Sequence, residues 1–150
     1  MKDALLVAIG AALDGVDVGF CAFDHQNRTI GWNATFLSMF PEHEGHVHVG
    51  APYAENLRRF YSLGLQGDQV ADIDRYIAEG ILRHQTQRRP YEFDHRDFRV
   101  RVSSFEIGTF GRLRVWCKVA MLPTHVKRPT STTQALEGLD VTCSPPAVPA

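Results

Sequence analysis

Three histidines stand close together in a polar segment, and histidine is one of the side chains that bind transition metals. His43, His46 and His48 form an H-x-x-H-x-H pattern, with Glu42 and Glu44 beside them. Imidazole and carboxylate groups can ligate zinc and other divalent cations. These residues follow one another on a single loop, however, and the sequence offers no matching cluster of cysteine or histidine elsewhere. We therefore predict a solvated loop and no metal site.

The short motifs that mark common active sites are missing from the sequence. It contains no Gly-rich phosphate loop, no G-x-S-x-G turn and no H-E-x-x-H helix. Serine, histidine and aspartate occur, but the sequence alone pairs no nucleophile with a base. We therefore predict that the chain is not an enzyme.

Basic residues alternate along the last two predicted strands and could share one face of a sheet. They are Arg99, Arg101, Arg112, Arg114 and Lys118, with Phe105 and Trp116 between them. A surface that combines basic and aromatic residues can bind nucleic acid. Acidic residues at positions 92, 94 and 106 balance this charge. We therefore favour a solvent-facing or helix-covered sheet face and expect no nucleic-acid partner.

The bulk composition of the 150-residue chain argues against other classes of partner. Sixteen basic and seventeen acidic residues leave a formal net charge of −1, so electrostatics gives no reason to expect nucleic acid or an anionic membrane. The longest apolar run, residues 4–13, is shorter than the roughly 20 residues of a membrane span. The three cysteines leave one unpaired in any disulfide scheme, so we expect a cytoplasmic protein.

The periodicity of apolar residues predicts the elements that position these side chains. Residues 2–14 carry an apolar stripe at helical spacing, formed by Leu5, Leu6, Ile9, Ala12 and Leu13. Strands over 16–23 and 29–32 precede a short helix that Asn33 should cap and Pro41 should end. Further helices begin at residue 52 and span 68–85, the latter with Arg83 facing outward and His84 near its exposed end. Strands over 91–94, 98–105 and 112–121 complete an antiparallel sheet in an α+β domain.

A change in composition divides the chain into two parts. Residues 1–122 hold all the predicted helices and strands. Residues 123–150 contain five prolines and no aromatic residue, so they bury too little apolar surface to offset the entropy of ordering. We predict that this second part is a disordered tail or linker.

In their order and spacing, these elements resemble a PAS sensory domain. Residues 15–24 (GVDVGFCAFD) look like the first strand of that family, which ends in an aspartate before a tight turn. Residues 27–33 (NRTIGWN) look like the second strand, which ends on the asparagine that opens a short helix. Residues 98–102 (FRVRV) and 113–116 (LRVW) look like the last two strands. The resemblance covers about residues 4–121.

The resemblance implies a five-stranded antiparallel sheet with helices packed on one face and an N-terminal helix. It gives Asp24 and Asn33 structural roles, in a turn and at a helix start. Members of the family often enclose a small ligand between the sheet and the helices. Strand phase and helix face place the following residues at such a site: Phe20, Trp32, Phe36, Val100, Val102, Val115 and Cys117. Aromatic side chains also dominate ordinary cores, so core and ligand cavity both stay open as interpretations.

The sequence does not identify a cofactor. Flavin photochemistry of the LOV type needs a cysteine on the short helix after the second strand, and residues 33–40 (NATFLSMF) contain none. Some members of the family bind haem through a helix histidine. His84 is the only histidine of the long predicted helix, but its place near the exposed end of that helix argues against haem.

Together these features predict a non-catalytic PAS module of a signalling protein. Such a module could bind a small organic ligand between the sheet and the helices. The conformational change caused by the signal would pass through the terminal helix or the last strand to an effector domain or protein partner. The apolar stripe of the N-terminal helix leads us to expect a homodimer. Two alternatives stay open, namely a small NTF2-like α+β enzyme acting on a hydrophobic substrate and a purely structural dimerisation module with a filled core.

Overall fold

The computed structural model describes residues 2–120. Helix α1 (Lys2–Asp14) precedes strands β1 (Val18–Phe23) and β2 (Thr29–Trp32). Helices α2 (Ala34–Met39), α3 (Tyr53–Gly64) and α4 (Ile73–Thr86) come next, with the short 3-10 helices η1 (Pro41–His43) and η2 (Gly67–Asp72) before α3 and α4 respectively. Strands β3 (Tyr91–His95), β4 (Phe98–Ile107) and β5 (Gly111–Val119) follow. The tail predicted over 123–150 lies outside the described residues.

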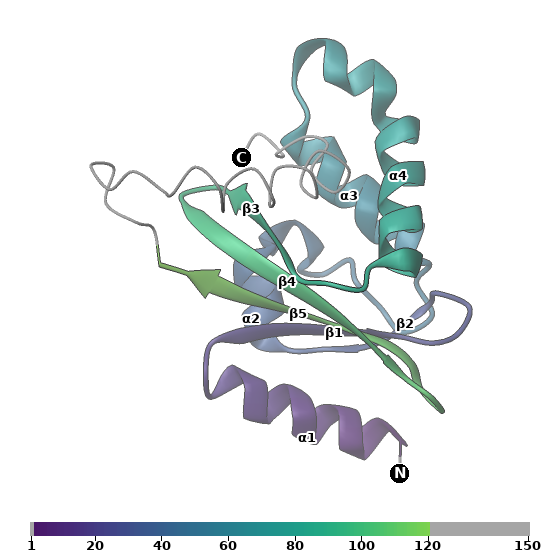
Figure 1. Ribbon diagram of the computed structural model, residues 1–150, viewed down its shortest axis with the longest axis vertical. Coiled ribbons are helices and arrows are strands. Elements are labelled where there is room, and N and C mark those ends of the chain that lie inside the picture. Colours follow the sequence, from purple (N-terminus) through teal and green to yellow (C-terminus); the bar gives the residue numbers. More distant parts are fainter. Residues whose placement is uncertain (1, 121–150) are drawn as a thin grey trace.

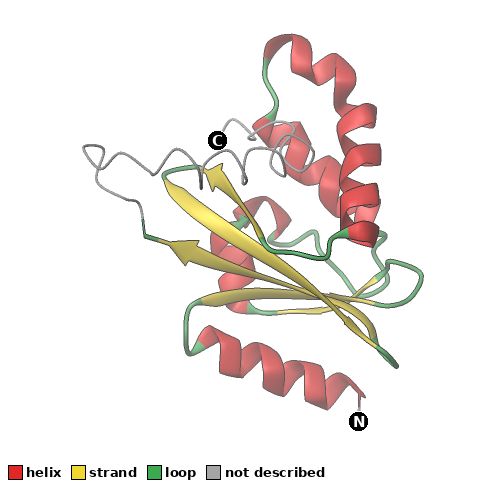
Figure 2. Cartoon of the chain, viewed as in Figure 1, coloured by secondary structure: helices red, strands yellow, loops and turns green. Residues whose placement is uncertain are grey.

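The five strands form one antiparallel sheet in the order β2-β1-β5-β4-β3. β1 pairs with β2 on one side and with β5 on the other, so the strand with two apolar faces lies inside the sheet. Gly111 begins β5 at φ 127°, where a Cβ atom would collide with the Phe23 carbonyl oxygen at the end of β1. The predicted α+β class and antiparallel sheet are confirmed, with β1 and β5 side by side although they lie far apart in the sequence (Figure 2).

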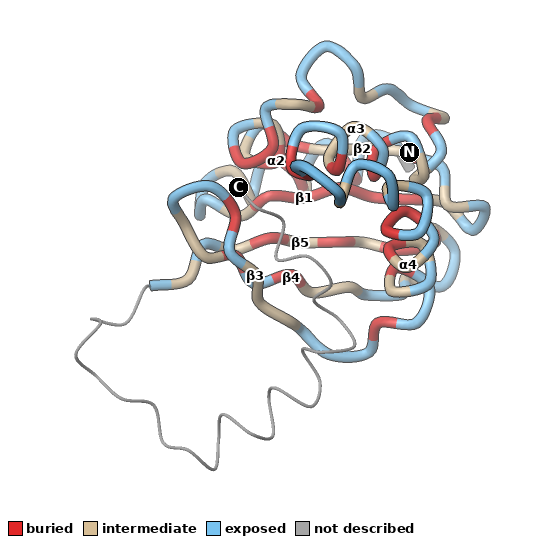
Figure 3. The backbone as a smooth tube through the Cα atoms, turned by 90° about the horizontal axis from the view of Figure 1, so that it is seen from above, coloured by how far each residue is buried: buried red, intermediate tan, exposed pale blue. Residues whose placement is uncertain are grey.

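Each face of the sheet has a different cover. On one face, which we call the α1 face, Leu6 of α1 is buried against Phe20 and Ala22. The other face, which we call the helix face, packs against the remaining helices around a core of eight buried residues: Cys21, Phe23, Phe36, Met39, Phe40, Val100, Val102 and Trp116. Figure 1 shows α1 on the side of the sheet away from α3 and α4. Figure 3 shows buried positions concentrated along β1 and β5, which both covers share.

The starts of two elements, β1 and α4, differ most from the prediction. β1 begins at Val18 rather than at residue 16, because the chain first turns off the end of α1. In that turn the N–H of Asp17 donates to the Asp14 carbonyl oxygen, and Asp17 itself has a left-handed φ of 56°. The helix predicted over 68–85 begins as the 3-10 helix η2, and α4 starts only at Ile73. Val70 of η2 is 53% exposed, so these first turns have no buried apolar anchor.

The basic residues of β4 and β5 do not share one face. Val102 of β4 stands opposite Trp116 of β5, and directly opposed residues point to the same side of a sheet. Even-numbered residues of both strands therefore lie on the helix face, which receives Arg112, Arg114 and Lys118. Odd-numbered residues lie on the α1 face, which receives Arg99 and Arg101. The register thus divides the predicted basic stripe between the two faces.

Candidate ligand site on the helix face

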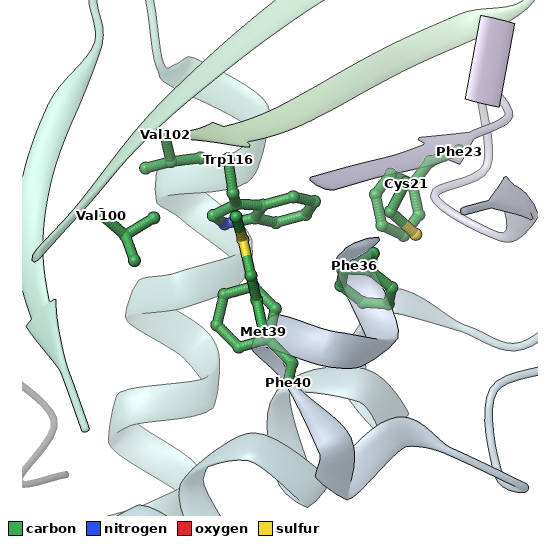
Figure 4. Close-up of a cluster of buried hydrophobic side chains, with 8 residues drawn as sticks. All are labelled: Cys21, Phe23, Phe36, Met39, Phe40, Val100, Val102 and Trp116. Carbon is green, nitrogen blue, oxygen red and sulfur yellow. The ribbon is translucent and has the colours of Figure 1, made fainter. Parts of the chain in front are cut away.

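Interlocking aromatic side chains occupy the helix face (Figure 4). The ring centroid of Trp116 lies 5.2 Å from that of Phe36 and 5.5 Å from that of Phe40. Figure 4 shows Trp116 of β5 beside Met39, the last residue of α2, and beside Phe40, which follows it, with Val102 of β4 close to the indole. Because the sheet and α2 both contribute to this packing, movement of α2 would disturb the rings of the sheet.

The residues predicted to line a ligand site separate into two groups. Four lie on the helix face: Trp32, Phe36, Val100 and Val102. The other three lie on the α1 face: Phe20, Val115 and Cys117. Val115 stands opposite Phe20 and Cys117 opposite Val18, which places both with the side chains under α1. The structure therefore brings only part of the predicted set together.

The double burial of β1 explains this division. Phe20, Cys21, Ala22 and Phe23 are all at most 1% exposed, so alternation along the strand does not reveal which side the helices cover. The predicted set consequently lacks four residues of β1 and β5 that lie on the helix face: Cys21, Phe23, Arg114 and Trp116. Trp116 itself could have indicated the correct face. It is a bulky aromatic residue that alternates with Val115 along β5 and therefore points to the other side of the sheet.

Asn33 joins three elements with one side chain. Its Oδ1 accepts hydrogen bonds from the N–H of Phe36 at 3.0 Å and from the N–H of Phe20 at 2.9 Å. Its Nδ2 donates to the carbonyl oxygens of Gly10 at 3.1 Å and Val18 at 2.9 Å. Asn33 is thus the predicted N-cap of α2, and its other hydrogen bonds connect α2 to the backbone of β1 and of α1.

A second contact ties the end of α1 to the start of α2. The Asp14 carboxylate accepts hydrogen bonds from the Thr35 N–H at 2.8 Å and the Thr35 hydroxyl at 2.7 Å. Burial acts to raise the pKa of Asp14, but the hydrogen bonds from Thr35 and Ala34 hold that pKa below its ordinary value. Asp24, the other predicted structural residue, accepts hydrogen bonds from the backbone N–H groups two and four residues later at 2.9 Å each.

The histidine-rich segment differs from the predicted solvated loop at one position. His46 and His48 are exposed. His43 is only 4% exposed, because its ring stacks on Phe36 with centroids 5.1 Å apart and its Nδ1 lies 3.0 Å from Arg59 Nη1. Within residues 2–120, no three His, Cys, Asp or Glu side chains gather where they could hold a metal ion.

One side of the C-terminal turn of α4 is buried, contrary to the prediction for Arg83 and His84, while Gln85 and Thr86 are exposed. His84 is 0% exposed, because its ring stacks 4.0 Å from that of Tyr53 and meets the edge of Phe23 at 4.8 Å. Arg83 is half-buried, with its guanidinium 5.9 Å from the centre of the Tyr91 ring. The prediction for these two residues was wrong because their side of the last turn packs on the helix face of the sheet.

Arg114 of β5 places a guanidinium beneath this turn. Its side chain is buried, with the residue only 3% exposed. Nη2 donates to the Tyr91 hydroxyl at 3.1 Å, and Nη1 lies 3.3 Å from His84 Nδ1. The rings of Tyr53 and Trp116 have their centres 5.9 and 5.8 Å from the guanidinium carbon. The helix face therefore combines an aromatic lining with a buried positive charge.

Burial also sets the protonation of the other titratable groups on this face. It lowers the pKa of His84 to about 2, and the positive charge of Arg114 adds to the shift. It lowers the pKa of His43 to about 4 with help from Arg59, and that of His95 to about 4 with help from Arg96. All three imidazoles are therefore neutral at pH 7. Burial raises the pKa of the Cys21 thiol, which leaves no reactive thiolate there.

Comparison with known proteins identifies one match. A family model described as PAS fold matches residues 13–107, from the end of α1 to the end of β4. Comparisons with curated proteins and with solved structures gave no significant match. None of the helices within residues 2–120 is long and apolar enough to span a membrane.

Proposed function

The chain belongs to the PAS family, and from this premise we propose that it is a non-catalytic module that senses a signal or binds a protein partner. PAS domains are generally sensory modules without catalysis of their own. In this proposal a small organic ligand binds between the sheet and the helices of a cytoplasmic protein. The resulting change passes through α1, or the end of β5, to an effector domain or protein partner.

The Asn33 junction is the observation that carries this proposal. An amide side chain has two N–H donors and two acceptor positions on its oxygen, and Asn33 uses all four. The acceptor side holds α2 and β1, while the donor side reaches the Gly10 carbonyl oxygen of α1 on the opposite face. A ligand that displaces α2 would strain these bonds and favour another position of α1, which supplies the two-state element that signalling requires.

One observation favours the alternative of a structural module with a filled core. The rings of Phe36, Phe40 and Trp116 already contact one another, and Met39 is only 2% exposed among them. Such packing stabilises a domain whether or not a ligand enters. Asn33 would then serve stability alone.

The enzyme alternative has weaker support. An NTF2-like domain would place a long pair of helices before its sheet, whereas the single helix α1 leads into β1 here. β1 then pairs with β5 and β2 within one five-stranded sheet. The buried imidazoles of the helix face are held neutral by packing against other rings, an arrangement that supports a structural role for them.

Native mass spectrometry of freshly purified protein tests the proposal against the structural module. We expect a dimer that carries an additional small mass, and we expect that mass to disappear when the same sample is denatured. The denatured sample is the control for covalent modification. A dimer without any bound mass, from several expression hosts and growth media, would support the structural module and contradict the sensory proposal.

A further inference from the structure

Arg114 is a buried positive charge without a negative partner among the described residues. No carboxylate of residues 2–120 lies within 4.0 Å of its guanidinium. Its hydrogen-bond partners, Tyr91 and His84, are a phenol and a neutral imidazole. Arg112, two residues earlier on the same face, differs, because it forms an ion pair with Glu106 at 2.8 Å and donates to Ser104. Among residues 2–120 the charge of Arg114 therefore has no carboxylate to compensate it, at a buried position where water screens it little.

Hydrogen-bond donors without partners gather around the same place. Arg114 Nε, Arg83 Nε and His84 Nε2 are all buried and have no partner in the structure. His84 Nδ1 faces the Nη1 donor of Arg114, so Nδ1 acts as the acceptor and the ring proton must sit on Nε2. Gln87 Oε1 is the single unpartnered acceptor nearby. Because His84 Nε2 points away from the Arg114 guanidinium, an acceptor for Nε2 is separate from an acceptor for Arg114 Nε. An anion beside Arg114 Nε would match both the unpartnered donor and the unpaired charge.

The shape of the surroundings narrows the chemistry of that acceptor. The Nε–H side of the Arg114 guanidinium is free, and its Nη2 neighbour contacts the Tyr91 hydroxyl, which retains its own hydrogen to donate. A carboxylate is planar and accepts two parallel hydrogen bonds from one side of a guanidinium. The rings of Tyr53 and Trp116 lie beside the same guanidinium, so aromatic side chains border this position.

We propose that Arg114 anchors the carboxylate of a small organic acid on the helix face, with the Tyr91 hydroxyl beside it as a further donor. This inference rests on the proposed ligand-binding function and names its ligand class. The acid would supply the missing negative charge and acceptors, while its apolar body would lie against the aromatic side chains. The charge of Arg114 on β5 then selects for a carboxylate, and the aromatic side chains around it select for the shape of the ligand.

Thermal unfolding in the presence of simple acids tests this proposal. Acetate and benzoate should raise the melting temperature of the wild-type protein in a saturable way, whereas benzamide, the neutral isostere of benzoate, should not. Arg114→Met should weaken the apparent affinity for benzoate at least tenfold. Arg101→Met is the matched control, because Arg101 is an exposed arginine on the α1 face, paired with Glu92, and its loss should change the affinity less than twofold.

A second measurement observes ligand binding in the wild-type protein, so it does not depend on whether Arg114→Met folds. In wild-type protein labelled with ¹⁵N-arginine, the Nε–H resonance of Arg114 should shift on addition of acetate, and its assignment follows from its absence in Arg114→Lys. The proposal is overturned if both acids act no more strongly than chloride at equal ionic strength, if inorganic phosphate matches them, or if Arg114→Met responds like the wild type. A neutral compound found by native mass spectrometry would overturn this inference and leave the proposed function standing.

Discussion

At the scale of single residues, the helix face shows how burial turns ordinary histidines into neutral packing groups. His43, His84 and His95 are each at most 4% exposed and each contacts aromatic rings. Their polarity predicts exposure when the sequence alone is considered. The packing of η1, α4 and β3 against the sheet reverses that expectation, because only contacts between distant segments reveal where these rings lie.

These histidines predict that the protein loses stability in mildly acidic solution. In the unfolded chain they bind protons near pH 6.5, while in the folded chain His43 and His95 resist protonation until about pH 4 and His84 until about pH 2. Their folded pKa values are depressed, so their contribution is complete above about pH 6.5 and falls as the pH drops below it. The slope approaches about 1.4 kcal/mol per pH unit for each histidine.

Urea unfolding between pH 7.5 and pH 5 measures this slope. His95→Gln should remove about one third of it, because glutamine keeps a polar group near the Met39 carbonyl oxygen without taking up a proton. The upper part of this pH range lies above the ordinary pKa of carboxyl groups, so the change in stability there comes from the histidines and not from Asp or Glu. A free energy of unfolding that stays constant from pH 7 to pH 5 would contradict the prediction.

At the scale of elements, the sequence predicts well which helices and strands form and in which order. It predicts poorly which face of the sheet each side chain lies on. Periodicity predicted α1, β2 and the start of α2 at the positions where they occur, since each has a clear signal such as the Asn33 cap. The faces of β1 and β5 could not be predicted, because β1 is apolar on both sides and its partner strand sets the phase of β5. Phe20 therefore lies under α1, while Trp116 and Arg114 occupy the helix face.

Arg114 illustrates the same limit for the candidate site. In the sequence it is one of several alternating basic residues, and its neighbours at positions 112 and 118 predict a solvated or covered stripe. Its functional interest arises from what surrounds it, namely the buried His84 in the last turn of α4 and the Tyr91 hydroxyl. Such an environment is assembled by tertiary packing and has no local signature.

At the scale of the whole molecule, the outward side of α1 is the surface that we propose for dimerisation. Val7 is 72% exposed and Leu5 48% exposed on this helix. No charged residue occurs between Asp3 and Asp14, so the helix is apolar on its outer side as well as on the side that packs on the sheet. A second copy of α1 would bury this surface and place the Asn33 junctions of both protomers near the interface.

Cross-linking tests this arrangement. In a chain with Cys117 and Cys143 replaced by serine, Val7→Cys should be joined to a second copy efficiently by a flexible bismaleimide. Val49→Cys is the matched control, because Val49 is similarly exposed at 69% but lies in the loop before α3. Equal cross-linking yields from the two positions would argue against a dimer through α1.

Amide hydrogen exchange in α1 tests most directly whether the helix face is coupled to the opposite side of the sheet. Met39→Ala removes a buried side chain from the last residue of α2, and Ile77→Ala removes one from the separate cluster between α3 and α4, each at a cost of about 2–5 kcal/mol. After scaling to global stability, we predict faster exchange in α1 for Met39→Ala alone, and we predict that Asn33→Ala abolishes this difference. Equal exchange in both variants, or a difference that persists without Asn33, would contradict the account.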